Sequence, residues 1–480
     1  MMLYCHRTVL KASKKLQTLC NRGLSSSSKA DLVHDKGSSL PVLPPQSLSS
    51  PLLFLPPKVD VDDKLDESFS AKHHDYFHFF SPAEQKRFRV TKKQYIPGQD
   101  REILTPDDAV CVGSSHGWLA FVHPRSCSPY LFNPLLQESP HLPYVPLPPY
   151  ETLDDIRCLR VQKSNYLSPS PSLIKDFVLL SLDSDYHRFI HENICQSFIQ
   201  KFAMSSAPSL PRSSFSQKST DHHNCTVMII DREHLCFCEL GDERWHALGE
   251  PDGFFYQEIM YFSKDQRFYA MSGGQHFEAW DLSDPSAPKR EVINPSSSPL
   301  ELGTVREFMR STPYCGYLYY LVESSGDILF VVRFYGNAGH SDWDGPQDSD
   351  QEEDRVDFVN TDYTGDFIES LRFYVYKLNL DQNKWESVEC LGDRALFVGL
   401  NHSFSLSTCD YPELRENSIY FTDDHEVAGN HTGHDNGIFH LKDNSFTPYY
   451  PLNLKSRKLP PVAVPQPVWV VPNKLYSSAV

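Results

Sequence analysis

The stretch FCELGDERWHAL (237–248) places a leucine, four polar residues and then a tryptophan in a row. The same order recurs in YKLNLDQNKWESV (376–388) and IFHLKDNSFTPY (438–449), where Leu240, Leu380 and Leu441 precede Trp245, Trp385 and Phe446. This spacing predicts a strand that ends at the leucine, a four-residue loop around a type I turn, and a return strand that opens on a large ring packed between sheets. A repeated hairpin of this kind indicates a repeated sheet.

Other parts of the chain carry the same signal. Short runs rich in Phe, Tyr, Val and Leu surround polar turns at 76–90, 117–134, 225–248, 267–282, 316–336 and 417–441. Each run holds two strand-length segments, which is typical of a hairpin. Because one small antiparallel sheet cannot bury both faces, the sheets must stack, and radial stacking gives a β-propeller. We predict an all-β fold of about six blades, each an antiparallel four-stranded sheet, with five or seven blades as alternatives.

The two ends of the predicted domain carry matched strands. PLLFLPP (51–57) and PVWVVPN (467–473) are both short apolar runs bounded by proline. Propellers commonly complete one blade from both chain ends, so we predict a single domain over 51–473. The segment 186–204 is less regular, and its apolar spacing fits either a helical insertion or a strand near 197–204.

The first 24 residues read as an organellar transit peptide. They hold Arg7, Lys11, Lys14, Lys15 and Arg22 and no acidic residue, with apolar side chains along one side of a possible helix. Arg22 stands two positions before Leu24, which places cleavage between Leu24 and Ser25. We predict import into mitochondria, with the matrix as destination, by way of the import machinery; plastids and a disordered basic tail are the alternatives. Residues 25–50 are rich in Ser and Pro and are predicted to form a disordered linker.

Composition narrows the classes of partner. The formal net charge is −17, so the body of the protein repels a phosphate backbone and a nucleic-acid partner is not expected. No apolar run is long enough for a transmembrane helix. The 12 cysteines lack a C-x-x-C pair, which favours free thiols in a reducing compartment.

The string VGSSHGW (112–118) matches the G-x-S-x-G of a serine-hydrolase nucleophile elbow. Such an elbow needs a helix directly after the serine. Ser115 is instead succeeded by HGWLAFVHP, whose alternation predicts a strand. We therefore expect Gly113 and Gly117 to permit a turn between strands and Trp118 to fill the gap between blades, with no catalytic residue here.

The histidine-rich strings DHHNC and HEVAGNHTGHD offer candidate metal ligands. They contain His222, His223 and Cys225, and His425, His431 and His434. Neither has zinc-site spacing, and no phosphate-binding glycine loop occurs, so neither a metal nor a cofactor is predicted. Asp393 and Arg394 are expected to lock a turn beside a strand.

The segment 342–366 carries ten acidic residues and one arginine. Counted from Asp342, Gly345 falls at the fourth position, whereas a calcium-binding EF-hand requires glycine at the sixth. We predict a disordered acidic loop between two strands of one blade. A functional alternative is a bait for a basic partner, carried by Asp348, Asp350, Glu352, Glu353 and Asp354.

Six strings in order resemble the plant KIB-type β-propeller family. They are CVGSSHGWLAFV (111–122), YLFNPLLQESPHLP (130–143), GDERWHAL (241–248), the run 373–408, NSIYFTDD (417–424) and PVWVVP (467–472). The resemblance covers about 51–473 and implies a kelch-like, F-box-associated propeller that holds a protein target while an F-box docks a ubiquitin ligase. Residues 1–50 do not resemble the helical, leucine-rich F-box, so the chain looks like an organellar branch of the family without one.

Two classes of function remain open on this basis. The first is a non-enzymatic protein-interaction module in mitochondria, whose partner is unknown. The second is an enzyme with a site at the central channel, for which an inward-facing group of Asp, Glu, His or Arg with shifted pKa values would be the sign. A relative of F-box substrate receptors that acts outside mitochondria is a further alternative, as is a propeller that has lost its ancestral partner.

Overall fold

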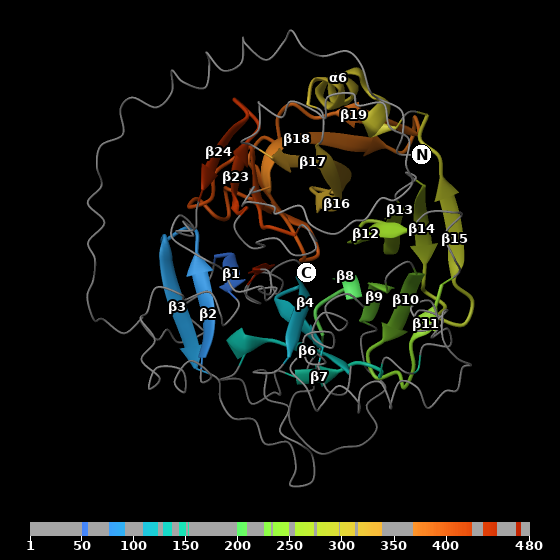
Figure 1. Ribbon diagram of the computed structural model, residues 1–480. Helices are drawn as coiled ribbons and strands as arrows, with labels where there is room; N and C mark the ends of the chain where they lie inside the picture. The colour runs from blue at the N-terminus through green and yellow to red at the C-terminus, as the bar shows by residue number, and fades with distance from the viewer. Residues whose placement is uncertain are drawn as a thin grey trace, which may run out of the picture.

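The structure is a computed structural model of the chain. It describes residues 50–55, 76–91, 109–122, 128–136, 144–149, 152, 199–208, 225–231, 234–248, 255–272, 276–296, 298–312, 315–337, 368–424, 435–448 and 467–471. These residues form six sheets set around a common axis, as the view along that axis shows (Figure 1). The predicted six-bladed β-propeller is confirmed.

The first three blades succeed one another along the chain, and the strands of each are named from the axis outward. Blade 1 holds β25 (Val468–Val470), β1 (Leu52–Leu55), β2 (Tyr76–Ser81) and β3 (Lys86–Thr91). Blade 2 holds β4 (Val110–Ser115), β5 (Trp118–Val122), β6 (Pro129–Phe132) and β7 (Tyr144–Pro146), with the short helix η3 (Pro134–Leu136) after β6. Blade 3 holds β8 (Ile199–Met204), β9 (Thr226–Asp231), β10 (His234–Glu239) and β11 (His246–Ala247).

The other three blades complete the ring. Blade 4 holds β12 (Tyr256–Phe262), β13 (Arg267–Ser272), β14 (Phe277–Asp281) and β15 (Lys289–Ile293). Blade 5 holds β16 (Gly316–Ser324), β17 (Asp327–Asn337), β18 (Ile368–Asn379) and β19 (Lys384–Ser387), preceded by η6 (Pro299–Glu301) and α6 (Gly303–Ser311). Blade 6 has five strands in the order β21 (Phe404–Ser407), β20 (Arg394–Val398), β22 (Ser418–Phe421), β23 (Gly437–His440) and β24 (Ser445–Pro448).

Blade 1 closes the ring from both ends of the described chain. Leu53 in β1 pairs with Trp469 in β25 on one side and with Phe80 in β2 on the other. Leu53 and Trp469 are fully buried, and they pack with Phe397 of blade 6 in one apolar cluster. The predicted closure by the two terminal strands is therefore confirmed.

The repeated leucine-to-ring hairpin joins the two outer strands of blades 3, 5 and 6. Each first strand ends one residue before the predicted leucine, and each return strand begins within one residue of the ring. Trp245 and Trp385 are buried, as predicted, whereas Phe446 is 38% exposed. Phe446 still lies against Phe373 of the neighbouring blade, with ring centroids 6.3 Å apart.

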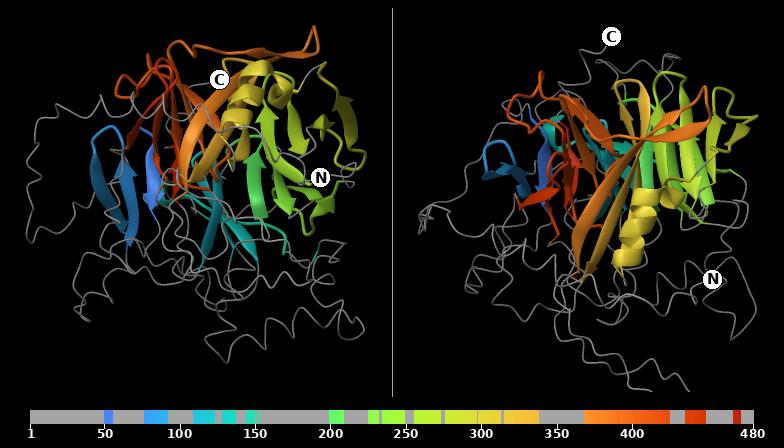
Figure 2. Two further views of the ribbon diagram at one scale, coloured as in Figure 1. Left: turned by 45° about the horizontal axis from the view of Figure 1, so that its top comes forward. Right: turned by 90° about the horizontal axis from the view of Figure 1, so that it is seen from above.

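Blade 5 has the longest strands, and α6 packs along them (Figure 2). Val305 is the buried residue of α6, and Phe308 rests on Phe334 of β17 with ring centroids 5.0 Å apart. No helix in the described parts of the chain is long and apolar enough to cross a membrane. Of the irregular segment 186–204, β8 accounts for Ile199–Met204, so the strand alternative holds there and 186–198 lie outside the described residues.

Blade 6 departs from the four-stranded antiparallel pattern. Its β20 pairs antiparallel with β21 and parallel with β22, so the chain crosses the sheet after β21 instead of continuing to the next strand. The five residues Gly399–Ser403 connect β20 to β21, and we call them the crossbar. The sequence pattern predicted four antiparallel strands in every blade, and for blade 6 this was wrong. The extra hairpin brings the crossbar into contact with the inner strands of other blades.

Candidate functional site

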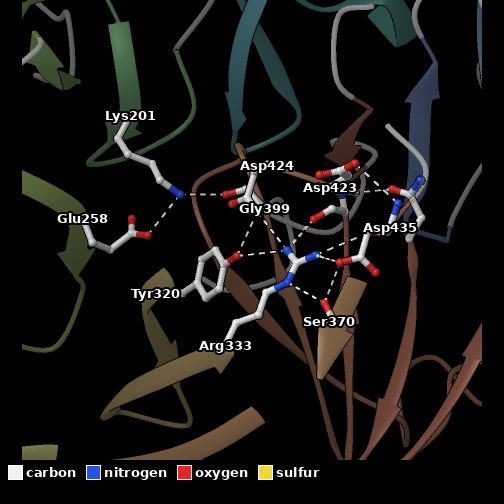
Figure 3. A network of polar contacts seen from close by, with 11 residues as sticks. Lys201, Glu258, Tyr320, Arg333, Ser370, Gly399, Asp423, Asp424 and Asp435 are labelled. Carbon is white, nitrogen blue, oxygen red and sulfur yellow. Dashed lines mark hydrogen bonds and ion pairs between the residues drawn. The ribbon is translucent and has the colours of Figure 1, made fainter. Parts of the chain in front are cut away.

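Buried and half-buried polar side chains from four blades meet near the propeller axis (Figure 3). We call this group the axial network; it comprises Lys201, Glu258, Tyr320, Arg333, Ser370, Asp424 and Asp435. Lys201, Glu258 and Tyr320 stand on β8, β12 and β16, the inner strands of blades 3, 4 and 5. The two aspartates lie within the connection between β22 and β23 of blade 6, Asp424 near its start and Asp435 near its end.

Arg333 on β17 is the centre of the network, and it is completely buried. Its Nη1 donates to the Thr422 carbonyl at 2.7 Å and to Asp424 Oδ1 at 2.8 Å. Its Nη2 donates to Asp435 Oδ2 at 2.8 Å, and its Nε donates to Ser370 Oγ at 2.8 Å. All three guanidinium nitrogens are therefore bonded, and they tie blade 5 to blade 6.

Charge and aromatic rings both hold the guanidinium in its charged form. Burial opposes the charge of Arg333, but Tyr320, Asp435 and Asp424 outweigh burial and raise its pKa. The Arg333 guanidinium carbon lies 4.8 Å from the centre of the Phe421 ring, a distance typical of a cation–π contact. Burial and Asp424 keep the Tyr320 hydroxyl protonated by raising its pKa.

Lys201 joins blade 3 to three other blades. Its Nζ donates to the Gly399 carbonyl in the crossbar at 2.7 Å and lies 3.1 Å from Glu258 Oε2, an ion-pair contact without good hydrogen-bond alignment. Its Nζ also stands 5.2 Å from the centre of the Tyr320 ring. Burial raises the pKa of Glu258 to about 7, although Lys201 favours the carboxylate.

A second cluster is formed by Ser115, His116 and His402, and we call it the serine–histidine cluster. Ser115 Oγ lies 2.9 Å from His116 Nδ1 and 3.0 Å from His402 Nδ1, and it accepts the Met204 N–H at 3.3 Å. Burial lowers the pKa of His116 to about 4. Burial, His116 and Lys201 lower the pKa of His402 to about 3. Both imidazoles are thus neutral near pH 7.

The VGSSHGW string forms a hairpin and not a nucleophile elbow. Its β4 ends at Ser115, and β5 begins at Trp118. His116 and Gly117 make the turn with φ of 50° and 79°, the pattern of a type I′ hairpin turn. Trp118 is fully buried in a cluster shared by blades 2 and 3. These parts of the prediction are confirmed.

The serine–histidine cluster itself was not predicted. No histidine was expected to meet Ser115, but His402 comes to it from 287 positions away. His402 lies after β20 in a loop whose length and composition carry no metal or catalytic motif. Because the contact arises from the unusual order of strands in blade 6, no local pattern indicates it.

Asp393 and Arg394 hold the β20–β21 hairpin, as expected, although each uses its own partner. Asp393 Oδ2 accepts from Ser407 Oγ at 2.5 Å. Arg394 Nε donates to Ser405 Oγ at 2.9 Å. Both bonds cross the same hairpin.

Several predicted residues lie outside the described residues. They are Leu24 and Ser25, the acidic group Asp348, Asp350, Glu352, Glu353 and Asp354, and His222, His223, His425, His431 and His434. Cys225 is described and buried, and its Sγ donates to the Ser206 carbonyl at 3.0 Å. Among the described residues, no three His, Cys, Asp or Glu side chains are placed to hold a metal ion. No disulfide joins any of the seven cysteines that the structure describes.

Comparison with known proteins finds similarity to one β-propeller family and to plant F-box proteins. The KIB1-4 beta-propeller family matches residues 79–440. A putative F-box protein of Arabidopsis thaliana is 44% identical over 50 residues, 10% of this chain and 14% of that protein. An F-box protein of the same plant is 28% identical over 225 residues, 46% of this chain and 52% of that protein. The chain thus spans about half, or less, of the length of these curated relatives.

Proposed function

The chain belongs to the KIB1-4 β-propeller family, and from this premise we propose that it is a non-enzymatic protein-binding module that works inside mitochondria. The observation that supports the proposal is that the charged groups of the axial network are paired with one another and with the main chain. The charged nitrogens of Arg333 and Lys201 bind groups of the protein itself, and Asp424 and Asp435 both accept bonds from Arg333.

A catalytic carboxylate or imidazole must be able to reach a substrate. In the axial network the charged groups contact one another and join neighbouring blades, which favours a structural role. The surfaces left for recognition are then the loops at the two faces of the disc, where propellers present binding residues on a rigid ring. The F-box names of the Arabidopsis relatives support a protein as the bound partner.

The mitochondrial part of the proposal rests on the basic, acid-free segment 1–24. We further propose that the chain belongs to an organellar branch of the family. Its test is import of the full-length chain into isolated plant mitochondria, followed by proximity labelling with a tagged copy. We expect protease protection, loss of a basic presequence near Ser25, and a reproducible neighbouring protein in the matrix.

A matched variant replaces Arg7, Lys11, Lys14, Lys15 and Arg22 by glutamine and leaves the propeller unchanged. It is expected to remain outside the organelle and protease-sensitive. Full-length chain that stays outside and co-purifies with a ubiquitin-ligase adaptor would instead support the receptor role that the relatives' names suggest. A diffuse labelling profile within the matrix would contradict a specific protein partner.

The serine–histidine cluster favours a second candidate, a hydrolase that uses Ser115. The hydroxyl of Ser115 lies beside two neutral imidazoles that accept protons, which is one requirement of an activated nucleophile. Against it, Ser115 is only 3% exposed, and the low pKa of both imidazoles makes them weak bases. Labelling of the full-length chain by a fluorophosphonate, lost in Ser115→Ala, would establish this candidate; we expect no labelling.

A further inference from the structure

The crossbar Gly399–Ser403 attaches blade 6 to the inner strands of blades 2 and 3. The Gly399 carbonyl accepts a hydrogen bond from Lys201 Nζ at 2.7 Å, and the main-chain N–H of His402 donates to the Ser114 carbonyl at 2.8 Å. A Cβ at Gly113 would lie 3.1 Å from the Leu400 carbonyl oxygen, so the two main chains approach closely there. Ser114 Oγ in turn donates to the Trp469 carbonyl of blade 1.

The hydrogen bonds of Ser115 Oγ fix the protonation of the two imidazoles. A hydroxyl oxygen has one proton to donate and two lone pairs. Met204 N–H uses one lone pair, so the two Nδ1 atoms are satisfied only if one of them donates and the other accepts. The accepting ring must then be neutral, and the donating ring carries its proton on Nδ1. Because the pKa of each ring is well below 7, His116 and His402 are both neutral near pH 7 and in opposite tautomers.

Protonation of both rings is incompatible with this arrangement. Each imidazolium carries a proton on Nδ1, so three N–H groups would point at one oxygen that has two lone pairs. The two charged rings would also stand with centroids 6.0 Å apart. We propose that His116 and His402 form a proton-sensitive lock, which holds the crossbar in the centre of the propeller while both rings are neutral and releases it when they take up protons.

Among the charged groups of the axial network, Lys201 is the one that acts on the serine–histidine cluster. Lys201 of β8 is the cation that faces His402, and together with burial and His116 it lowers the pKa of His402 to about 3. Glu258 of β12 is the ion-pair partner of Lys201, and Asp424 acts electrostatically on Glu258. Glu258 therefore interacts with Lys201 and Asp424, whereas Lys201 is the charged side chain that lowers the pKa of His402.

The pH range in which the lock opens depends on the direction in which the locked structure shifts the pKa of each imidazole. The pKa of each imidazole is lower in the locked state than in the released state, so the locked state binds fewer protons. The lock is therefore complete above the ordinary imidazole pKa of about 6.5, and it weakens as pH falls below that value. Below that value, and above the pKa of about 4 for His116 in the locked state, each imidazole favours release about tenfold per pH unit. At pH 5.5 the released fraction is therefore expected to exceed that at pH 7.5 about a hundredfold.

The test is amide hydrogen exchange of the full-length chain, read by mass spectrometry at pH 7.5 and 5.5 and corrected for the intrinsic exchange rate. Peptides over 394–407 report the crossbar, and peptides over β17 report the blade interior. We expect protection of the crossbar to fall about a hundredfold at pH 5.5, about tenfold in His402→Asn, and not to change in the double variant His116→Asn/His402→Asn. Protection over β17 is expected to stay constant.

Two variants separate the lock from other pH effects. Glu258→Gln removes the carboxylate that titrates in the same range, and Asp327→Asn removes an exposed ion pair with Lys377 on blade 5. Both are expected to keep the pH response of the crossbar. Equal protection at the two pH values in the wild type, or an equal loss in the double variant, would overturn the proposal.

A direct measurement covers the case in which the double variant does not fold. Exchange of the imidazole C2 hydrogen, measured by mass spectrometry on the wild-type chain, gives the pKa of each histidine. Values well below 6.5 for His116 and His402 are expected, whereas ordinary values for both would overturn the lock.

Discussion

Lys201 and Glu258 face each other from the inner strands of blades 3 and 4, with Nζ 3.1 Å from Oε2 and side chains that are 10% and 1% exposed. The pair is an interblade contact in a buried place, where desolvation of the two charges opposes their attraction. The pKa of about 7 for Glu258 shows that desolvation outweighs attraction to Lys201. Replacing the carboxylate therefore has a pH-dependent effect.

Glu258→Gln is expected to become relatively more stable as pH rises. Between the ordinary pKa of 4.5 and the folded value of about 7, the folded chain holds a proton on Glu258 that the unfolded chain has lost. The stability that Glu258 contributes is present at low pH and is lost as pH rises through 7. Relative to wild type, the free energy of unfolding of Glu258→Gln should rise by on the order of 3 kcal/mol from pH 4.5 to 8. Urea unfolding of both proteins at several pH values measures it, with Glu84→Gln, an exposed site in the turn between β2 and β3, as the control; a constant difference between Glu258→Gln and wild type would contradict the prediction.

Arg333→Met should destabilise the propeller strongly. The substitution keeps an unbranched apolar stem but leaves Asp424 and Asp435 without their buried cation. Breaking a buried ion pair by removing one partner costs about 3–5 kcal/mol. The matched control is Lys377→Met, whose ion pair with Asp327 is about 40% exposed on both sides, and it should cost less than about 1 kcal/mol. Equal losses for the two variants in denaturant unfolding would refute a structural role for the arginine.

Gly399→Ala tests the close packing of the crossbar. An added Cβ would overlap Thr422 Oγ1, and the backbone φ of Gly399 is +149°. Gly392→Ala is the control, because Gly392 also has a positive φ of +64° but nothing lies within 4 Å of its added Cβ. Gly399→Ala should cost about 1–3 kcal/mol more than the control because of overpacking. Thr422→Ala, which removes the clashing hydroxyl, should restore part of the loss in thermal melts; absence of rescue would count against the clash.

Trp469→Ala should weaken ring closure more than a comparable change at the rim. Trp469 is fully buried between blades 1 and 6, with its ring edge-on to Phe397 at 5.1 Å. Truncating such a side chain costs about 3–5 kcal/mol. Phe446→Ala removes another large ring at a position that is 38% exposed, and it should cost distinctly less. Similar melting temperatures for the two variants would contradict the assignment of Trp469 to the closing blade.

Features that depend on neighbouring residues were readable from the sequence. The Leu240–Trp245 and Leu380–Trp385 hairpins, and the strands of blade 1, carry period-two alternation and turn residues that act within a few positions. Each tryptophan then meets the preceding blade: Trp245 Nε1 donates to the Pro148 carbonyl at 2.8 Å, and Trp385 packs against Phe277 at 5.6 Å. Phe446 holds the equivalent position on the outermost strand of blade 6, yet it is 38% exposed, and the shared spacing did not predict this difference.

Local sequence patterns could not predict the residues that meet in the axial network. Arg333 meets Asp424 and Asp435 from 91 and 102 positions away, and each is separated from its partners by whole strands in the sequence. Their partnership depends on which blades are neighbours and on the parallel pairing of β20 with β22. Sequence periodicity predicts strands and turns, but it does not predict the order of strands within a blade or the residues that meet across the axis.

The pairing of β1 with β25 also constrains how this protein is made. During translation β1 leaves the ribosome before the strands of blades 2 to 6, and its partner β25 leaves after them. Blades 2 to 6 can therefore fold before blade 1 is complete. Until then Leu53 and its neighbours present an unpaired edge, a surface that invites aggregation and chaperone binding. Slow synthesis, or premature termination shortly before residue 468, would leave the strands of blades 2 to 6 present while blade 1 lacks its inner strand and the ring stays open.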